Sequence, residues 1–278
     1  MHFTNISGYA FKPLTDLEEL KNKLKVVCSE LSLKGSILIS EEGINVFLAG
    51  SEDKLDTFEK QLPSLGLPEI EFKKSPSESI PFKKLLIKIK PEIITVGRPD
   101  ISPTKTPAPY IEPEVLKTWL DEGREVVLLD TRNDYEIYLG KFKGAIDCDI
   151  KNFHEFPDAI QKLDPALKEK TIVTYCTGGI RCEKAAPILM EAGFTKVHQL
   201  EGGILQYFED CQDAHYEGEC FVFDKRIAVN SALQETDTVQ CFACRMPVTS
   251  EAQQSPHYVV GESCPFCFDK PEEKLSSA

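Results

Sequence analysis

One cysteine, Cys176, lies between a predicted strand and a glycine-rich loop, a position that suits a catalytic nucleophile. Cys176 follows a β-branched run at residues 171–174, which is typical of a buried strand. Arg181 opens residues 181–190, whose apolar spacing predicts a helix. The residues between the cysteine and the arginine are Thr177, Gly178, Gly179 and Ile180. The chain therefore runs from a strand through a cysteine and a glycine-rich loop to an arginine at the start of a helix.

This loop has the composition of an anion-binding nest. Glycines allow the backbone to curl so that successive N–H groups point inward, and a helix N-terminus adds partial positive charge. Arg181 adds a full charge. A cysteine facing such a nest is a thiolate near neutral pH and hence a nucleophile. The alternative is an unreactive cysteine buried at a strand end, but the combination of features favours the reactive interpretation.

The loop resembles the active-site loop of rhodaneses, in which four residues separate the cysteine from the arginine. Residues 126–136 and 140–145 resemble a second rhodanese signature, with Lys141 in the place of the usual His. This resemblance implies an α/β domain with a cysteine that carries sulfur as a persulfide. Asp130 and Arg132 end another predicted strand, and we expect them either to brace the same loop or to form an ordinary structural ion pair.

A narrower resemblance covers nearly the whole chain. The segments Tyr175-Cys-Thr-Gly-Gly-Ile-Arg-Cys-Glu-Lys184, Glu41-Glu-Gly-Ile-Asn45 and Gly218-Glu-Cys-Phe-Val-Phe-Asp224 together resemble the rhodanese-domain tRNA uridine hydroxylases. The resemblance implies oxygen-dependent hydroxylation of carbon 5 of the wobble uridine, position 34 of tRNA. It implies tRNA as the partner, molecular oxygen as co-substrate and Cys176 as nucleophile or persulfide carrier. The sequence shows no flavin or haem motif.

Two other functions stay open at this point. A persulfide sulfurtransferase, the plain rhodanese activity, needs the same cysteine loop and no RNA-binding surface. A non-catalytic adaptor would use the outer parts of the chain as interaction surfaces. The intact Cys176 and Arg181 argue against the adaptor, because inactive rhodanese modules usually lose the cysteine.

Four further cysteines have the spacing of metal ligands. Cys241 and Cys244 form one short pair, Cys264 and Cys267 form another, and 19 residues separate the pairs. Two such pairs predict a zinc-ribbon-like site, because each turn presents two thiolates to one tetrahedral ion. The alternatives are free thiols in two separate turns or a redox pair. Zinc is favoured because the segment has too few apolar residues for a core of its own.

The elements that must position these groups fall into four parts. Residues 1–98 predict a ferredoxin-like α+β domain with β-α-β-β-α-β order, including a strand at 69–73 and a first helix capped by Thr15. Residues 99–113 hold five prolines and predict a stiff linker. Residues 114–215 alternate strands and helices, which predicts a rhodanese-like α/β domain with a parallel sheet covered on both faces. Residues 216–278 form a small Cys-rich segment whose last ten residues are expected to be disordered.

The basic residues concentrate in one place. The net charge of −13 argues against indiscriminate nucleic-acid binding, yet residues 1–98 carry 14 basic and 14 acidic residues. A strand predicted at 84–90 carries lysines on its exposed side, which either protect a sheet edge or bind phosphates. The family resemblance favours RNA. The candidate RNA-binding residues are Lys83, Lys84, Lys88 and Lys90.

The remaining features bear on location. No apolar run approaches the roughly 20 residues of a membrane helix, so no membrane partner is expected, and residues 1–6 lack the pattern of an export signal. The ten cysteines then fit a reducing cytoplasm. Cys28 and Cys148 have apolar neighbours and are expected in cores. Cys211 and Cys220 are left over, and either of them or neither approaches Cys176.

Overall fold

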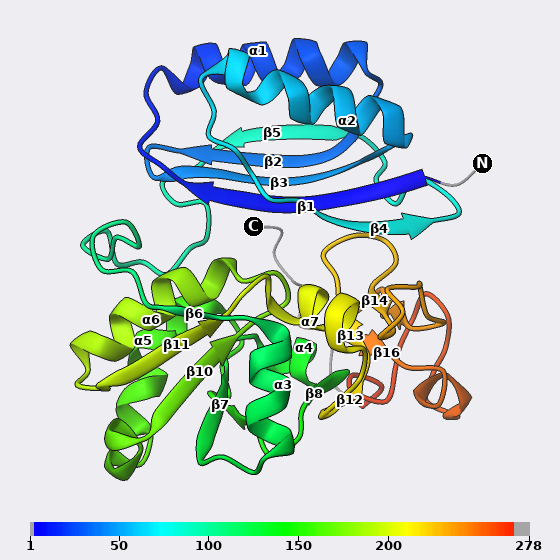
Figure 1. Cartoon of the computed structure of the whole chain (residues 1–278). Coiled ribbons are helices and arrows are strands. Elements are labelled where there is room, and N and C mark those ends of the chain that lie inside the picture. Colours follow the sequence, from blue (N-terminus) through cyan, green and yellow to red (C-terminus); the bar gives the residue numbers. More distant parts are fainter. Residues whose placement is uncertain (1–2, 270–278) are drawn as a thin grey trace.

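A computed structural model describes residues 3–269 of the chain. The predicted disorder of the last ten residues lies outside this range, apart from Asp269. Two α/β units are stacked with the sheet of the first facing the second, and a small Cys-rich segment lies at one side (Figure 1). No helix among the described residues is long and apolar enough to span a membrane.

The N-terminal unit is a five-stranded sheet with two helices on one face (Figure 1). The strand order is β4-β1-β3-β2-β5, and all neighbours are antiparallel except β2 and β5. The apolar faces of the helices pack on the sheet in one core that includes Leu24, Phe58 and Val46. The elements are β1 (Phe3–Phe11), α1 (Leu17–Glu30), β2 (Lys34–Ser40), β3 (Gly43–Gly50), α2 (Glu52–Gln61), η1 (Leu62–Leu65), β4 (Lys73–Ser77) and β5 (Leu85–Ile89).

The β-α-β-β-α-β prediction is confirmed, with two local corrections. The strand predicted at 69–73 lies instead at Lys73–Ser77, because that stretch is the one in register with β1. Thr15 does not cap the first helix. Its hydroxyl bonds to Asp16, which is the N-cap residue in a left-handed conformation with φ 52° and makes no side-chain capping bond.

The second unit has a parallel sheet with order β6-β11-β10-β7-β9. The strands predicted at 126–130, 171–175 and 196–200 form at those positions. Helices cover both faces: one core joins α5 and α6 to the sheet through Phe156, Ala186 and Ile172. The other core joins α3 and α7 through Leu116 and Tyr207. The parallel α/β prediction is confirmed.

The main elements of this unit are β6 (Tyr110–Ile111), α3 (Pro113–Asp121), β7 (Val126–Asp130), α4 (Asp134–Ile137), β8 (Gly140–Phe142), β9 (Ile146–Asp147), α5 (Phe156–Ala159), β10 (Thr171–Tyr175), α6 (Ile180–Glu191), β11 (Lys196–Leu200) and α7 (Gly203–Cys211). Short 3-10 turns are η2 (Phe153–Glu155), η3 (Ile160–Lys162) and η4 (Pro165–Glu169). The proline-rich stretch is anchored on this unit, since Ile101 and Ala108 are buried in its core. The exact domain limits stay a prediction.

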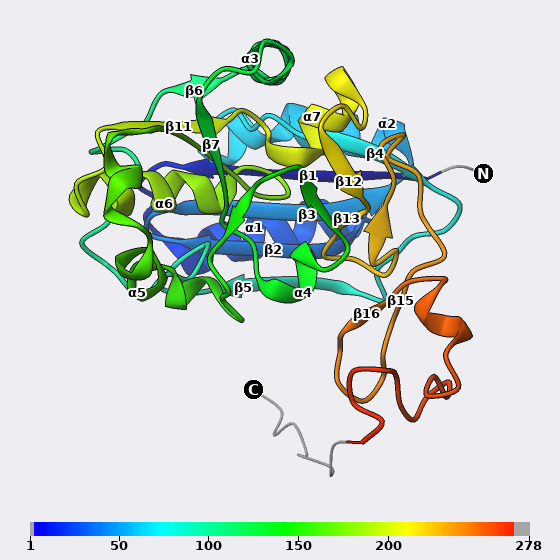
Figure 2. The ribbon, with the colours of Figure 1, turned by 90° about the horizontal axis from the view of Figure 1, so that it is seen from below.

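The C-terminal segment consists of small two-stranded pieces. Its elements are β12 (Tyr216–Gly218), β13 (Cys220–Phe221), β14 (Ala228–Val229), β15 (Val239–Gln240), β16 (Pro247–Val248) and η5 (Ala252–Gln254). The strand β12 pairs with β8 of the α/β unit, and β13 pairs with β14. Viewed from below, the β15–β16 hairpin and the chain after it extend to one side of both sheets (Figure 2).

Buried charges hold the two large units together. Lys184 on α6 is fully buried, and its Nζ lies 2.9 Å from Glu42 and 2.6 Å from Glu92. Its Nζ also donates to the carbonyl oxygen of Ile94 at 3.0 Å. Glu42 belongs to the turn between β2 and β3, and Glu92 follows β5. A buried cation with two carboxylates is costly to break, because removing either side leaves uncompensated charge.

Candidate active site

The loop between β10 and α6 folds around the sulfur of Cys176. The strand ends at Tyr175, and Gly179 is the N-cap of α6 with φ 95°, a conformation that favours glycine. The backbone N–H of Gly179 donates to Cys176 Sγ at 3.1 Å. Cys176 is only 1% exposed. The predicted strand, loop and helix are therefore all present, with at least one backbone donor aimed at the sulfur.

The surroundings make Cys176 acidic. Burial by itself raises the pKa of this thiol, but a hydrogen bond with Cys182, the charge of Arg181 and the backbone N–H groups of Arg181 and Gly179 lower it further than burial raises it. The pKa of Cys176 falls from 9.0 to about 6. The sulfur is therefore a thiolate at neutral pH, which is the nucleophilic form.

Cys182, in the first turn of α6, is the proton-carrying partner of this pair. Burial and the bond to Cys176 raise the pKa of Cys182 well above its ordinary value. Its Sγ lies 3.9 Å from the hydroxyl oxygen of Thr131, which follows β7. One thiolate and one thiol thus share the buried loop. Sequence reasoning missed Cys182 as a participant, although it stands directly after Arg181.

Arg181 is bound to a carboxylate that the sequence analysis did not single out. Its two terminal nitrogens donate to Glu136 at 2.6 and 2.7 Å, and both side chains are buried. Glu136 also accepts the backbone N–H of Asn133 at 3.1 Å, which fixes the first turn of α4. The hydroxyl of Thr177 donates to Glu136 at 3.4 Å. Arg181 therefore supports the loop from within an ion pair rather than as a free cation.

Asp130 and Arg132 form a second, fully buried ion pair. Arg132 Nε and Nη2 donate to the two carboxylate oxygens of Asp130 at 2.9 and 2.6 Å. Arg132 Nη2 also donates to the carbonyl oxygen of Gly140 in β8 at 2.7 Å. This geometry ties the end of β7 to β8. The support that this pair gives to the Cys176 loop stays a prediction.

A second glycine pair closes the loop from the other side. Gly203 begins α7 with φ +65°, and a Cβ at this position would lie 2.5 Å from the carbonyl oxygen of Cys176. The N–H of Ile204 donates to that same oxygen at 2.9 Å, and the N–H of Leu205 donates to the carbonyl of Thr177 at 3.1 Å. A signal for this helix was present in the sequence, because residues 202–204 repeat the Gly-Gly-Ile of residues 178–180.

The N-terminal unit covers the loop with a tyrosine. Tyr9 of β1 donates its hydroxyl to Glu183 at 3.0 Å, and Tyr110 donates to the same carboxylate oxygen at 2.6 Å. The Tyr9 oxygen lies so close to Gly179 that an added Cβ there would be 3.0 Å away. Burial and the charge of Glu183 raise the pKa of Tyr9 well above its ordinary value, so it stays a donor. The Cys176 loop thus has beside Gly179 a residue, Tyr9, that lies 170 positions earlier in the chain.

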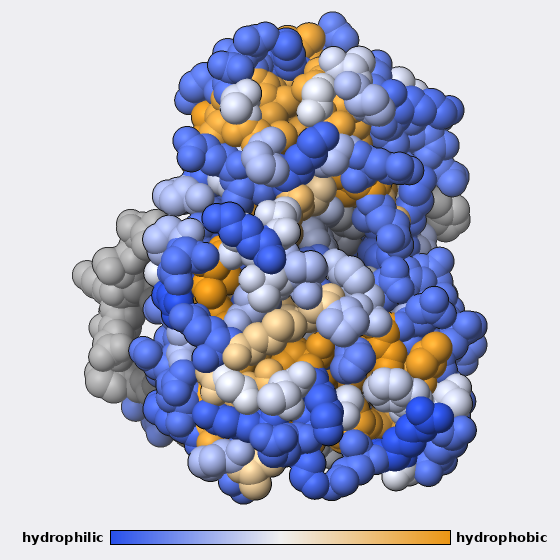
Figure 3. Space-filling view, turned by 60° about the vertical axis from the view of Figure 1, so that its left-hand side comes forward, coloured by the Kyte–Doolittle hydropathy of each residue, from blue (hydrophilic) through white to orange (hydrophobic). Residues whose placement is uncertain are grey.

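A cavity of about 1040 Å³ lies between the open face of the N-terminal sheet and the Cys176 loop. Its wall includes Thr177, Gly178, Ile180 and Arg181 of the loop, with Cys176 among the least exposed lining residues. Figure 3 shows one side of the molecule, where hydrophobic residues are visible in the upper lobe and in the lower part among a mostly hydrophilic surface. The cavity places the reactive sulfur where two units meet.

The four candidate RNA-binding lysines separate into two pairs. Lys88 and Lys90 line the cavity, on the exposed face of β5 and the chain directly after it. Lys83 and Lys84 precede the strand, are exposed and do not line the cavity. Another basic residue, Lys73 of β4, also lines it and reaches Gly202 at the start of α7. The N-terminal unit therefore contributes lysines to the cavity wall, together with the carboxylates of Glu69 and Glu71.

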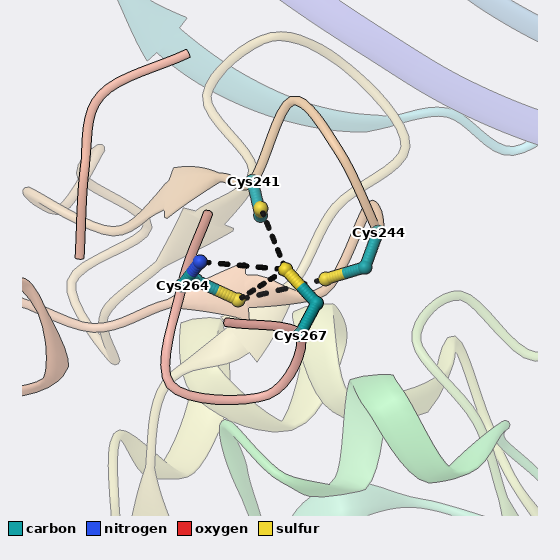
Figure 4. Close-up of side chains that lie close together, drawn as sticks. All are labelled: Cys241, Cys244, Cys264 and Cys267. Atoms are coloured by element: carbon teal, nitrogen blue, oxygen red, sulfur yellow. Dashed lines mark hydrogen bonds between the residues drawn. The ribbon is translucent and has the colours of Figure 1, made fainter. Parts of the chain in front are cut away.

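The four C-terminal cysteines come together as the spacing predicts. Their sulfurs all lie within 4.8 Å of one another, and the close pairs are 3.5, 3.8 and 3.9 Å apart. Figure 4 shows the four side chains pointing toward a common centre. A tetrahedral zinc ion with Zn–S bonds of about 2.3 Å requires sulfurs about 3.8 Å apart. The donor set and its spacing fit zinc.

The other cysteines are accounted for by burial. Cys28 and Cys148 are in apolar cores, as predicted, and burial raises the pKa of each to about 12. Cys220 is fully buried near Thr177, and burial raises its pKa to about 12 as well. Cys211 lies at the end of α7 and is half-buried. Cys176 is thus a far stronger acid than Cys28, Cys148 or Cys220.

Comparison with known proteins identifies both large units and the whole chain. Residues 3–93 match the family described as UPF0176 acylphosphatase like domain, and residues 112–210 match the rhodanese-like domain family. A Cupriavidus taiwanensis protein named tRNA uridine(34) hydroxylase is 50% identical over 274 residues, which are 96% of this chain and 97% of that protein. A Burkholderia lata protein of the same name is 48% identical over 277 residues, 96% of this chain and 98% of that protein. Among solved structures, the rhodanese-like domain of an Anabaena protein is similar at 27% identity and a TM-score of 0.34, over 40% of this chain and 79% of that one.

Proposed function

The chain belongs to the family of the tRNA uridine(34) hydroxylases, and from this premise we propose that it hydroxylates uridine 34 of tRNA with the Cys176 thiolate as nucleophile. It is an enzyme of tRNA modification built on a rhodanese domain. The observation that carries the assignment of the site is the buried thiolate, with a pKa lowered to about 6, at the wall of a cavity between two units.

The proposed chemistry begins with addition to the pyrimidine. Cys176 Sγ forms a bond to carbon 6 of the uracil, and the electron pair of the 5,6 double bond moves toward carbon 5. Carbon 5 then becomes the nucleophile that reacts with molecular oxygen, the co-substrate. One oxygen atom remains on carbon 5 and the other leaves as water, with two electrons from a thiol reductant. Loss of the carbon 5 proton and of the sulfur restores the aromatic ring and the thiolate.

The residues around the sulfur have distinct roles in this scheme. The backbone N–H groups of the loop hold the thiolate before addition and take it back after elimination. Arg181, fixed by Glu136, keeps the loop in its nested shape and supplies positive charge. The Cys182 thiol donates to the thiolate and returns no proton to it at neutral pH, because its own pKa is raised. Thr177, Gly178 and Ile180 form the wall against which the base lies.

The tRNA is bound, in this proposal, by the lysines of the cavity wall. Lys88 and Lys90 line it, so their side chains are placed to contact phosphates next to the target nucleotide. Lys83 and Lys84 lie outside the cavity and would contact phosphates further along the RNA. The remainder of the chain is acidic, so a local basic surface is needed for any RNA contact. A tRNA substrate and reduced thiols both fit the cytoplasm that the sequence predicts.

Zinc is proposed as a structural ion in the C-terminal segment. Cys241, Cys244, Cys264 and Cys267 would hold it, and zinc with four thiolates supplies folding energy rather than catalysis. The segment has a core of only a few apolar residues around these cysteines, among them Val248 and Phe266. A bound ion would therefore replace the missing hydrophobic core.

The test combines product and substrate analysis. The purified protein, tRNA with an unmodified uridine 34, oxygen and a thiol reductant are expected to yield 5-hydroxyuridine, identified by mass spectrometry of the nucleosides. Cys176→Ser is expected to yield far less, lower by on the order of 10³-fold or more. The same preparation is assayed for transfer of sulfur from thiosulfate to cyanide. Sulfur transfer without any 5-hydroxyuridine would overturn the proposal in favour of a sulfurtransferase.

A further inference from the structure

Phe223 is an aromatic side chain in the cavity that the chemistry described above leaves unused. It is 48% exposed, whereas its chain neighbours Phe221 and Val222 are each 5% exposed. It lines the same cavity as Cys176 and Arg181. A single exposed apolar side chain on an outer surface needs no explanation. An aromatic ring left open inside the cavity of a reactive cysteine does.

The turn that carries Phe223 is closed by its own hydrogen bonds and fixed to the N-terminal unit. The N–H of Val222 donates to the carbonyl of Ile227 at 2.9 Å, which closes the turn after β13. Within the turn, Arg226 and Asp224 form a buried ion pair at 2.6 Å. Arg226 Nη1 also donates to the hydroxyl of Ser75 in β4 at 2.8 Å. Phe223 is thus presented by a turn that is bonded to the N-terminal sheet.

The ring itself is held beside the loop of the thiolate. The Arg181 guanidinium lies 5.7 Å from the centre of the Phe223 ring. Phe221 packs edge-to-face against the ring, with centroids 5.2 Å apart and planes at 75°. Arg181 is in turn fixed by Glu136 and lowers the pKa of Cys176. The ring and the sulfur are therefore positioned by the same arginine.

A uridine within RNA is stacked between its neighbours, and Cys176 is only 1% exposed. The target base must therefore leave its stack and enter the cavity before the sulfur can reach it. Enzymes that take in a single base replace the lost stacking with an aromatic side chain. A ring that is partly open, lines the same cavity and lies against Arg181 of the Cys176 loop meets this need.

We propose that Phe223 is the platform on which the uracil of the target uridine stacks while carbon 6 faces the sulfur of Cys176. The inference rests on the proposed function and adds the residue that receives the base. Phe223 is a positioning residue for this reaction through direct contact with the substrate ring. The ligand is a single pyrimidine that has left its stack. Phe223 contacts the face of this ring and makes no hydrogen bond to its edge.

A matched control exists in the same chain. Phe242, in the Cys-rich segment, is 69% exposed and has the Arg245 guanidinium 5.5 Å from its ring centre. It is therefore similar to Phe223 in side chain, exposure and cationic neighbour, but it does not line the cavity. Phe242→Leu removes the same atoms as Phe223→Leu without removing the proposed platform.

The experiment measures kcat, KM and RNA affinity for both variants. Phe223→Leu is expected to raise KM for tRNA roughly 5- to 150-fold, the value of one base–aromatic stack. Phe242→Leu is expected to leave KM unchanged, and Phe223→Trp, which keeps a stacking face, is expected to keep or lower it. The rate of Cys176 alkylation is expected to be equal in all variants, because the loop is intact.

A second RNA tests the contact itself. The same tRNA with an abasic site at position 34 has no ring to stack, so the wild-type protein and Phe223→Leu are expected to bind it equally. An unchanged KM in Phe223→Leu, a raised KM in Phe223→Trp, or a further loss of affinity for abasic RNA in Phe223→Leu would each overturn the platform. A wild-type protein that makes no 5-hydroxyuridine from uridine 34 would instead overturn the proposed function.

Discussion

The two cysteine sites of this protein use the same side chain in opposite ways. The sulfur of Cys176 is held by groups from the fold itself: the N–H of Gly179, the thiol of Cys182 and the charge of Arg181. The four sulfurs of the C-terminal cluster have mainly one another as close neighbours. The first site is a contiguous loop that distant residues such as Glu136 and Tyr9 support, and the second consists of two short turns. At the first site the fold lowers the pKa of the cysteine, whereas at the second, in our proposal, a bound zinc ion stabilises the fold.

The largest expected effect is on activity at the first site. Cys176→Ser is expected to lower 5-hydroxyuridine formation by on the order of 10³-fold or more, because a serine hydroxyl does not ionise at neutral pH. Thermal unfolding is expected to change little, since the oxygen still accepts the N–H of Gly179. Cys241→Ser is the control, and it is expected to leave the alkylation rate of Cys176 intact. A Cys176→Ser protein with near-normal turnover would remove the nucleophile from the mechanism.

The next effect is structural and confined to the second site. The protein is expected to bind about one zinc ion per chain. A strong chelator is expected to make residues 238–269 sensitive to protease, because metal binding supplies on the order of 10 kcal/mol to such segments. Cys176 alkylation and the protease resistance of the α/β unit are expected to persist. If the metal-free protein keeps an ordered C-terminal segment, the cluster does not depend on an ion.

Variants of the buried Arg181–Glu136 pair separate two effects at the first site: the effect of the Arg181 charge on the pKa of Cys176 and the effect of the ion pair on the stability of the fold. Glu136→Gln is expected to reduce the free energy of unfolding by about 3–5 kcal/mol, because it leaves a buried guanidinium without its carboxylate. It is not expected to raise the pKa of Cys176, since the cation remains. Arg181→Ala, by contrast, removes the cation and is expected to raise that pKa. Denaturant unfolding and the pH dependence of alkylation separate the two outcomes, and a raised pKa in Glu136→Gln would contradict this assignment.

A smaller effect appears in the pH dependence of labelling. With a pKa of about 6, Cys176 is expected to react with an alkylating agent roughly tenfold faster at pH 8 than at pH 5. Cys28 and Cys148, with pKa values of about 12, are expected to react negligibly across that range. The folded state lowers the Cys176 pKa from 9.0, so its contribution to stability is lost as pH falls through about 6 and is complete above about 9. Equal labelling of the three cysteines at pH 7 would exclude a thiolate nest.

The smallest expected effect concerns RNA, which only the first site requires. Replacing Lys88 and Lys90 by Gln is expected to flatten the log–log dependence of tRNA affinity on salt by roughly 0.7–0.9 per lost phosphate contact. Both lysines line the cavity, whereas Lys83 and Lys84 do not. The Lys83→Gln, Lys84→Gln protein is therefore the control, with a smaller change in slope expected. Thiosulfate turnover, if present, is expected to survive in both. A slope in the Lys88→Gln, Lys90→Gln protein equal to that of the wild type would mean that the cavity lysines only protect an edge strand.

The local parts of the active loop could be predicted from the sequence because they are contiguous. The strand ending at Tyr175, the glycine pair and the helix that carries Arg181 follow one another without interruption. The runs of β-branched and apolar residues also gave the strands of the parallel sheet correctly, because buried parallel strands have no polar alternation to interpret. The clustering of the four C-terminal cysteines was predictable for the same reason, since the spacing within two short turns determines it.

The groups that complete the active site could not be predicted, because the fold brings them from far away. Glu136 lies 45 positions before Arg181, and Tyr9 of the N-terminal sheet lies 174 positions before Glu183. Nothing in a local pattern distinguishes such residues from ordinary surface ones. The error at β4 has a similar origin: residues 69–73 alternate as a strand should, but the pairing with Phe3 to Ser7 of β1 selects residues 73–77.

The burial of Lys184 has a consequence for how this protein can be divided or recombined. Its ammonium group lies between Glu42 and Glu92. The N-terminal unit therefore carries the carboxylates of this ion cluster, and the rhodanese unit carries the cation. A rhodanese domain joined to a foreign partner without both carboxylates would have to bury a bare cation at the seam, at a cost of several kcal/mol. Grafting experiments should therefore transfer Lys184, Glu42 and Glu92 as one set.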